Sequence, residues 1–312
     1  MNVAFNPFTG NLDFFGTHGG GGGGGGATGQ SFAAVWYDRD FTIFPLIDLG
    51  NGTDFAYAWY SCSSLTEFPL VDLSSGTNFA YAWYSCSSLT EFPLVDLSSG
   101  TNFANAWYSC SSLTEFPLVD LSSGTNFFRA WYNCALLTEF PLVDLSSGTN
   151  FEECWHSCSA LEVFPVADLS NGTNFRSAWN SCSALLEFPL VNLSNGTNFF
   201  GAWSYCSSLT EFPLLDLSSG TNFAYAWSYC TSLEDFPAGM FDTCLATNFD
   251  GAWNNCALTE ASVDNILVSL DEAGQEDGTV SIDGGTNAPP GTAGLAAKAS
   301  LEAKGWTVTV NE

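Results

Sequence analysis

The sequence predicts an α/β solenoid, a leucine-rich-repeat-like stack of about nine 24-residue coils with a short strand and a short helix in each. The dipeptide Phe-Pro recurs every 24 residues from Phe44 to Phe236. A Trp column and a Cys column, which begin at Trp59 and Cys62, repeat with the same period. Such a period is typical of proteins in which each coil packs only against the coils before and after it.

The extent of this pattern divides the chain into three regions. Residues 1–40 are expected to form an N-terminal anchor segment and a polyglycine linker, residues 41–257 the solenoid, and residues 258–312 a C-terminal α+β cap. In the last region, SVDNILVSL and AGLAAKASLEAKG are predicted to be short helices, and WTVTV is predicted to be a strand. An atypical end of this kind covers the last apolar face of a solenoid.

The strand of each coil is predicted near Phe68–Leu70. Leu65, Phe68 and Leu70 have the spacing that leucine-rich repeats use for inward-facing strand residues. Pro69 lacks the N–H that a strand ladder needs, so the strand is either shorter than this or has that nitrogen turned outward.

The helix of each coil is predicted to follow the SSGT turn, with Asn78 as its N-cap. On such a helix, the apolar residues of Phe79–Cys86 share one face at positions i, i+3, i+4 and i+7. Residues 80, 81, 84 and 85 would then point outward.

The outward positions carry much of the chemical variety of the repeats. Exposed Tyr, Asn, Arg and His on a rigid frame suit the recognition of a glycan or a protein. The alternative is a solvated face that varies because nothing constrains it. The candidate ligand-binding residues are Tyr81, Asn105, Phe128, Arg129, Glu152, Glu153, His156, Arg176, Asn180, Phe200 and Tyr205.

The Cys column and two acidic columns have simple structural interpretations. The sequence contains no C-x-x-C pair and only two His, so the Cys residues are predicted to be small buried hydrophobes, although an oxidised pair such as Cys154 and Cys158 stays open. The acidic columns through Asp72 and Glu67 could hold calcium, but Asn192 in the Asp column favours backbone hydrogen bonding in a turn. We therefore expect no metal and no cofactor.

Charge and motifs limit the classes of function. The net charge of −28 and a pI of about 4.1 argue against binding to nucleic acid or to an anionic membrane. No signal peptide and no transmembrane segment are expected. The chain also lacks a nucleophile elbow, a P-loop and a dinucleotide fingerprint, so we expect no enzyme and no catalytic residue.

Two stretches resemble known families. The unit FPLVDLSSGTNFAYAWYSCSSLTE, with its W-x-x-C-x-x-L-T-x-F-P core and Asp-Leu-Ser turn, resembles the BspA-like leucine-rich repeats of bacterial surface proteins. That resemblance implies cell-surface adhesion without catalytic residues. The stretch AFNPFTGNLDF at Ala4–Phe14, followed by polyglycine, is similar to the starts of structural proteins of marine cyanobacterial phages.

Together these features predict a non-enzymatic adhesin or receptor-binding appendage, such as a phage tail fibre or fibre tip, that binds a host surface glycan or protein. Residues 1–18 would join other virion or fibre subunits, and we expect a homo-oligomer on the virion or an extracellular surface. Two alternatives stay open. One is a structural spacer, decoration or filament subunit, and the other is an exported bacterial surface protein.

Overall fold

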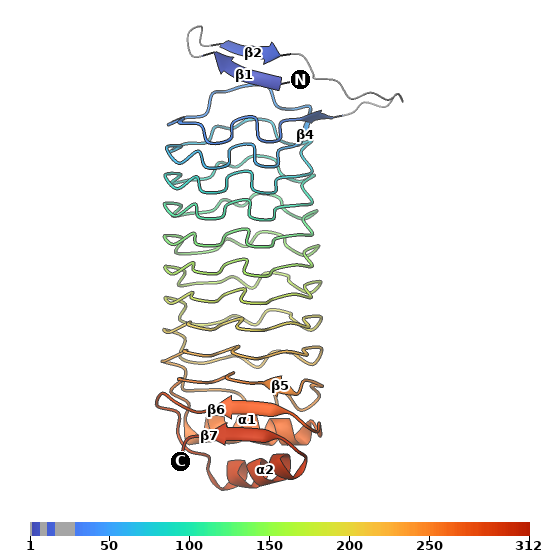
Figure 1. Cartoon of the computed structure of the whole chain (residues 1–312), viewed down its shortest axis with the longest axis vertical. Helices are drawn as coiled ribbons and strands as arrows, with labels where there is room; N and C mark the ends of the chain where they lie inside the picture. The colour runs from blue at the N-terminus through green and yellow to red at the C-terminus, as the bar shows by residue number, and fades with distance from the viewer. Residues whose placement is uncertain (1, 7–10, 16–28) are drawn as a thin grey trace.

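The computed structural model describes residues 2–6, 11–15 and 29–312, and it contains a repeat solenoid with an α+β cap at its C-terminal end (Figure 1). The coils stack along the long axis of the molecule. Near the N-terminus, strands β1 (Asn2–Asn6) and β2 (Asn11–Phe15) pair antiparallel. The polyglycine linker lies outside the described residues.

Single-residue parallel bridges join neighbouring coils at two places. One column of bridges runs from Asp54 through Asn78 to Asn222, and the other runs through the column of Glu67. The pairing extends beyond one residue only in short strands at the two ends of the stack, within residues 29–257. These strands are β3 (Gln30–Ser31), β4 (Gly52–Asp54) and β5 (Asn248–Phe249).

The helix predicted for each coil is wrong, because the chain forms consecutive turns there, as residues 79–86 show. The odd-numbered residues donate their N–H groups to carbonyls of the next coil at 2.7–2.8 Å, and residues 82, 84 and 86 donate three residues back at 3.0–3.3 Å. The remaining N–H, of Ala80, donates to Oδ1 of Asn78 at 3.2 Å. Every N–H of this segment therefore has a partner, and none needs the i to i−4 bond of a helix.

These turns explain why the apolar spacing resembled a helix. Tyr81 and Ser85 have left-handed φ angles of +58° and +55°, and the equivalent residues of the other coils do too. A left-handed third position is what a type II turn requires. Because the left-handed positions repeat every four residues, the inward side chains also repeat at intervals close to the 3.6 residues of a helix turn.

The predicted strand at Phe68–Leu70 is also wrong. Leu65 and Phe68 are buried as expected, but Leu70 is 68% exposed. The N–H of Val71 donates to the carbonyl of Pro69 at 2.9 Å, which makes a three-residue γ-turn centred on Leu70. This turn points Leu70 outward and lets Val71 fill the interior. The missing N–H of Pro69 is harmless, because the inter-coil bridge lies at Glu67 instead.

The interior is built from continuous columns of equivalent side chains. Trp59 and Trp83 stack at 5.2 Å between ring centroids, and Phe68 meets both indole rings edge-on. The thiol of Cys86 donates to the carbonyl of Trp59 at 3.2 Å. Burial raises the pKa of Cys110 to about 12, so these thiols stay protonated. The prediction of buried Cys is confirmed, and all eleven Cys residues are free thiols.

The stack begins before residue 41, where we had placed its start. Phe32 stacks on Phe55 at 5.5 Å, and Trp36 stacks on Trp59 at 5.4 Å. Residues 29–40 therefore form the turn segment of an additional, partial coil and are not part of a linker. This coil was not predicted from the sequence, because no Phe-Pro dipeptide precedes residues 29–40.

The C-terminal cap has the predicted helices and strand. The helix α1 begins after Thr259, whose side chain accepts a hydrogen bond from the N–H of Ser262. Strand β5 of the last coil continues into a parallel sheet in the order β5-β6-β7, and α2 connects β6 to β7. Within residues 2–6, 11–15 and 29–312, no helix has the length and apolar character needed to span a membrane. The cap elements are α1 (Glu260–Glu272), β6 (Thr279–Ile282), α2 (Thr292–Ala303) and β7 (Thr307–Val310).

Candidate recognition face

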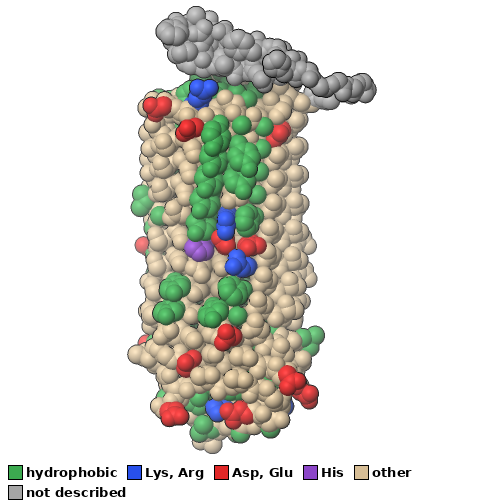
Figure 2. Space-filling model, viewed as in Figure 1, with side chains coloured by type: hydrophobic (Ala, Val, Ile, Leu, Met, Phe, Trp, Pro, Cys, Tyr) green, Lys and Arg blue, Asp and Glu red, His purple; other side chains and the backbone are tan. Residues whose placement is uncertain are grey.

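One side of the solenoid carries a ladder of stacked rings (Figure 2). Neighbouring rings of the ladder lie 4.5–4.6 Å apart, with their planes within 9° of each other. A shorter second row beside it contains Tyr57 and Tyr81, which stack at 4.6 Å. We call the surface formed by the outward side chains of the turn segments the ring face. Its ladder consists of Tyr37, Tyr60, Tyr84, Tyr108, Tyr132 and His156.

Stacking limits what the ring face can bind. Each inner ring of the ladder has both of its faces covered by neighbours, so only ring edges and hydroxyl groups meet solvent. A sugar that packs its C–H groups on an aromatic face would find that face free only at the end of a ladder. Ring edges and hydroxyls instead suit hydrogen bonding and packing against a protein surface.

In its middle, the ring face changes from tyrosines to a cluster of four charged side chains. Arg129 Nε donates to Glu153 Oε2 at 2.8 Å. Arg176 Nη1 donates to Glu152 Oε1 and Glu153 Oε1, both at 3.1 Å. Glu153 is only 8% exposed, so two guanidinium groups neutralise a carboxylate that is largely removed from water. The hydrogen bond that Arg129 donates to Glu153 raises the pKa of Arg129.

Two phenylalanines extend this cluster. The Arg129 guanidinium carbon lies 4.8 Å from the ring centre of Phe128, and that of Arg176 lies 5.2 Å from the ring centre of Phe200. Arg129 and Arg176 are the only Lys or Arg residues between positions 41 and 257 of the sequence. Within residues 41–257, the cluster is therefore the one part that offers cations as well as anions. Figure 2 shows these side chains between two stretches of aromatic residues.

His156 ends the ladder next to this cluster. Its ring stacks on Tyr132 at 4.5 Å, and its Nδ1 lies 2.9 Å from Ser157 Oγ. Burial is the main cause that lowers the pKa of His156, and by smaller amounts Glu153 raises this pKa and Arg129 lowers it. A neutral imidazole is consequently favoured at neutral pH.

The structure brings most of the predicted ligand-binding residues together. Four of them form the charged cluster: Arg129, Glu152, Glu153 and Arg176. Three more lie beside it: Phe128, His156 and Phe200. Asn180 lies in the same turn segment as Arg176, and its amide donates to the carbonyl of Gly201 at 3.4 Å. Tyr81 belongs to the row before the cluster, and Tyr205 stacks on Tyr229 at 4.7 Å after it.

Two of those residues are buried, although the sequence predicted that they would be exposed. Asn105 is 3% exposed, and Glu153 is buried as described above. Both occupy the left-handed position of a turn, where the side chain lies between those of the neighbouring coils. Phe128 and Phe200 are half-buried, so the ring face exposes less of these side chains than the predicted helix would have done.

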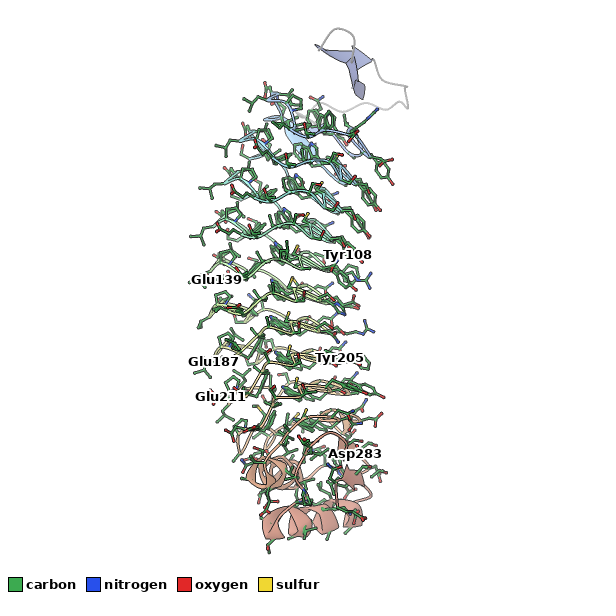
Figure 3. The ribbon with its side chains drawn as sticks, turned by 90° about the vertical axis from the view of Figure 1, so that its left-hand side faces the viewer. Tyr108, Glu139, Glu187, Tyr205, Glu211 and Asp283 are labelled. Atoms are coloured by element: carbon green, nitrogen blue, oxygen red, sulfur yellow. The ribbon has the colours of Figure 1, made fainter. Side chains whose placement is uncertain are left out.

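The opposite side of the solenoid carries a surface that sequence reasoning missed. Figure 3 shows Glu139, Glu187 and Glu211 on the edge opposite Tyr108 and Tyr205. Beside that acidic column runs an apolar column whose members are 57–75% exposed. The Pro in front of each member was the signal that could have placed it outside. We call this surface the leucine face, and its apolar column consists of Leu46, Leu70, Leu94, Leu118, Leu142, Val166, Leu190 and Leu214.

The carboxylates of the Asp column beside the leucine face accept hydrogen bonds within turns. Asp72 Oδ1 accepts hydrogen bonds from the N–H and the hydroxyl of Ser74 at 3.0 and 2.7 Å, and these bonds lower the pKa of Asp72. Among the residues that the structure describes, no group of three or more His, Cys, Asp or Glu side chains is arranged to hold a metal ion.

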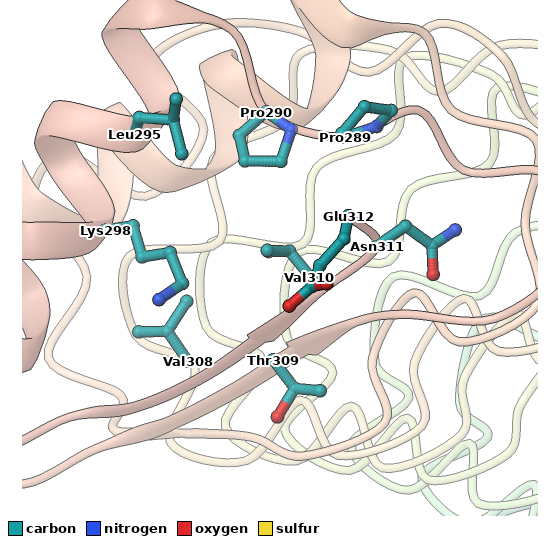
Figure 4. A pocket seen from close by; sticks show the side chains of 9 residues that line it. All are labelled: Pro289, Pro290, Leu295, Lys298, Val308, Thr309, Val310, Asn311 and Glu312. Carbon is teal, nitrogen blue, oxygen red and sulfur yellow. The ribbon is translucent and has the colours of Figure 1, made fainter.

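A hollow of about 580 Å³ lies at the end of the cap (Figure 4). Leu295 and Lys298 of α2 form one wall, and Val308 and Val310 of β7 form the other. The ammonium of Lys298 pairs with Glu302 on the same helix, and Glu312 is the other titratable residue that lines the hollow. Strand β7 is the outer strand of its sheet.

Comparison of the chain with protein-family models, curated proteins and solved structures finds no match. The function therefore has to be argued from the two faces and the cap.

Proposed function

We propose that the protein is a non-enzymatic adhesin or receptor-binding appendage of a phage particle, and that its ring face binds a host surface protein or glycan. The observation that carries the proposal is the charged cluster of Arg129, Glu152, Glu153 and Arg176 with its flanking rings. It combines Arg, Tyr and Phe, the residue types that dominate the energetics of protein interfaces, on a rigid frame.

The rigidity of the frame supports binding more than catalysis. The backbone of each turn segment donates four hydrogen bonds to the next coil, so the outward side chains lose little further freedom when a ligand binds. The covered ring faces favour a ligand that offers hydrogen-bond partners and acidic or basic groups. A surface protein, or a glycan contacted through its hydroxyl groups, meets that requirement.

The test replaces the cluster by the residues that the coil of Phe79–Cys86 has at the same positions. The protein tolerates those residues elsewhere in the same backbone, and Tyr81 shows that tyrosine fits the left-handed position by stacking on Tyr57. The variant carries Phe128→Ala, Arg129→Tyr, Glu152→Ala, Glu153→Tyr, His156→Tyr, Arg176→Ala and Ser177→Tyr.

Adsorption of the labelled full-length chain to a panel of marine cyanobacterial cells would be measured for wild type, this variant and a control. The control is Leu136→Ser with Leu186→Ser, which changes two exposed residues that lie outside both faces. We expect the cluster variant to keep its melting temperature and to lose about tenfold or more in adsorption, whereas the control adsorbs like wild type. Unchanged adsorption of the cluster variant would contradict the proposal.

One observation favours a second candidate, a filament or spacer subunit. Strand β7 leaves one edge of the β5-β6-β7 sheet unpaired, and an unpaired edge can accept a strand of another copy. Electron microscopy of the purified chain separates the two functions. Long rods made of end-to-end copies would favour the filament, and single rods would favour the adhesin.

A further inference from the structure

The apolar column of the leucine face is not needed by the fold. The interior of each coil is already filled by Phe68, Val71 and Leu73, which are at most 6% exposed, while Leu70 between them points into solvent. The chain nevertheless places Leu at seven of the eight positions of this column and Val at the other. A monomer rarely exposes a continuous apolar row of this length unless the row contacts something.

The charges beside the column restrict what that partner can be. Around each coil, the outward side chains follow the order Glu67, Pro69, Leu70, Asp72, so the apolar column runs between a Glu column and an Asp column. Each of these columns holds seven carboxylates, all of them exposed. The two cations of residues 41–257, Arg129 and Arg176, are on the ring face and do not offset them.

A second copy of this chain is a poor partner for the leucine face. Two leucine faces in contact would bring four acidic columns together without a cation between them, and like charges at such an interface oppose association. A partner with an apolar row and basic residues on both sides of it would instead satisfy both features of the surface.

The spacing of the coils indicates the secondary structure of that partner. The centroids of the Phe rings directly beneath the leucine face, such as those of Phe68 and Phe92, lie 5.6–6.2 Å apart in neighbouring coils. Residues i and i+4 of an α-helix lie about 6.0 Å apart along its axis, whereas alternate residues of a strand lie about 6.6 Å apart. The apolar stripe of a helix advances by alternating steps of three and four residues, about 4.5 and 6.0 Å, so a helix laid along the stack offers on average about one apolar side chain to each coil.

We propose that the leucine face binds a basic amphipathic α-helix of a partner protein. The apolar side chains of the helix pack between successive leucines. A groove of about 380 Å³ between two neighbouring coils offers such a place, and it is lined by Leu118, Leu142, Asp120 and Asp144. Lys or Arg residues on both flanks of the helix reach the Glu and Asp columns. This surface is separate from the ring face, so either proposal can fail without the other.

The probe for this proposal is a synthetic amphipathic helix of about 25 residues with Leu at positions a and d and Lys at e and g of each heptad. Two matched peptides accompany it. One has Glu in place of every Lys, and the other has the same composition in an order without an apolar stripe. Fluorescence anisotropy with the full-length protein measures the three dissociation constants in low salt.

We expect the striped Lys peptide to bind at least about tenfold more tightly than either matched peptide, because only it offers both the apolar row and the charges. The variant Leu94→Ser, Leu118→Ser, Leu142→Ser should lower its affinity about tenfold or more, and the control Leu136→Ser, Leu186→Ser should leave the affinity unchanged. Since all five positions are exposed, both variants should fold.

Three results would overturn the proposal. The first is equal binding of the striped and unstriped Lys peptides, which would show attraction by charge alone. The second is unchanged binding by the triple Leu variant. The third is a wild-type dimer, seen by light scattering, that the triple variant abolishes while no peptide binds, which would assign the leucine face to contacts between copies.

Discussion

The ring face and the leucine face are made from the same coils, yet they differ in almost every physical property. On the ring face, equivalent rings stack at 4.5–4.7 Å, and the side chains cover one another. Beneath the leucine face, equivalent rings are 5.6–6.2 Å apart, and the outward leucines contact solvent. The aromatic rings of neighbouring coils therefore lie closer together on the ring face than beneath the leucine face.

Backbone hydrogen bonding accounts for this difference. Each turn segment on the ring side donates four N–H groups to the next coil, whereas the segment of Phe68–Asp72 contains a proline and a γ-turn. Dense hydrogen bonding specifies the ring-side backbone independently of the outward side chains, and it holds even residues such as Tyr81 and Arg129 in left-handed conformations. The outward residues of the ring face can therefore vary, because the backbone alone specifies the fold there. Backbone hydrogen bonding does not explain why the leucine column is uniform.

The largest effect on stability is expected on the ring face, when one charge of the cluster is removed. Arg129→Ala leaves the buried carboxylate of Glu153 with one guanidinium in place of two, and we expect a loss of about 2 kcal/mol in the free energy of unfolding. Urea denaturation measures it. The double variant Arg129→Tyr, Glu153→Tyr should recover most of that loss, and a double variant as unstable as the single one would contradict this account.

A smaller effect with the opposite sign is expected at a left-handed position. Ser85 has a φ of +55°, and its hydroxyl makes no hydrogen bond within the part of the chain that the structure describes, so Ser85→Gly should raise the free energy of unfolding by about 0.5–1 kcal/mol. Ser85→Ala is the matched control and should give no gain. Thermal unfolding followed by circular dichroism distinguishes them, and equal melting temperatures for both variants would argue against strain at this position.

A third difference should appear as the pH falls. The folded protein holds the pKa of His156 below its ordinary value of 6.5, so the unfolded chain binds more protons there. Stability contributed by neutral His156 is fully present above pH 6.5 and is lost as the pH falls below that value. His156→Tyr, which continues the tyrosine ladder, should remove this part of the pH dependence between pH 7.5 and 5. Identical profiles for wild type and variant would show that burial of the imidazole has no such consequence.

The smallest effect is expected on the leucine face itself. Leu118→Ser removes an exposed side chain that supports no other residue, and we expect the free energy of unfolding to change by less than about 0.5 kcal/mol. Val119→Ser, one residue further along and buried, should cost several times more. A large loss from Leu118→Ser would mean that the apolar column stabilises the fold, and it would remove the reason to assign it a partner.

Prediction from the sequence succeeded where a residue type and its repeat period determine burial. The columns of Trp59, Cys62 and Leu65 are buried as expected, and the helices and strand of the cap lie where their patterns placed them. It failed where two backbone conformations share one periodicity. A helix of 3.6 residues per turn and a series of four-residue turns bury nearly the same positions, so the spacing of Phe79, Trp83 and Cys86 could not distinguish them.

By itself, the sequence determined that the chain stacks 24-residue coils, because matching side chains at a fixed period can be buried only by stacking. It also determined which residues vary and that the repeats are acidic. Only the tertiary structure decided that the variable positions are left-handed turns closed by inter-coil hydrogen bonds, and that Glu153 lies between two arginines. It alone placed Leu70 in solvent, because the direction of a side chain after a proline depends on a backbone γ-turn and not on residue spacing.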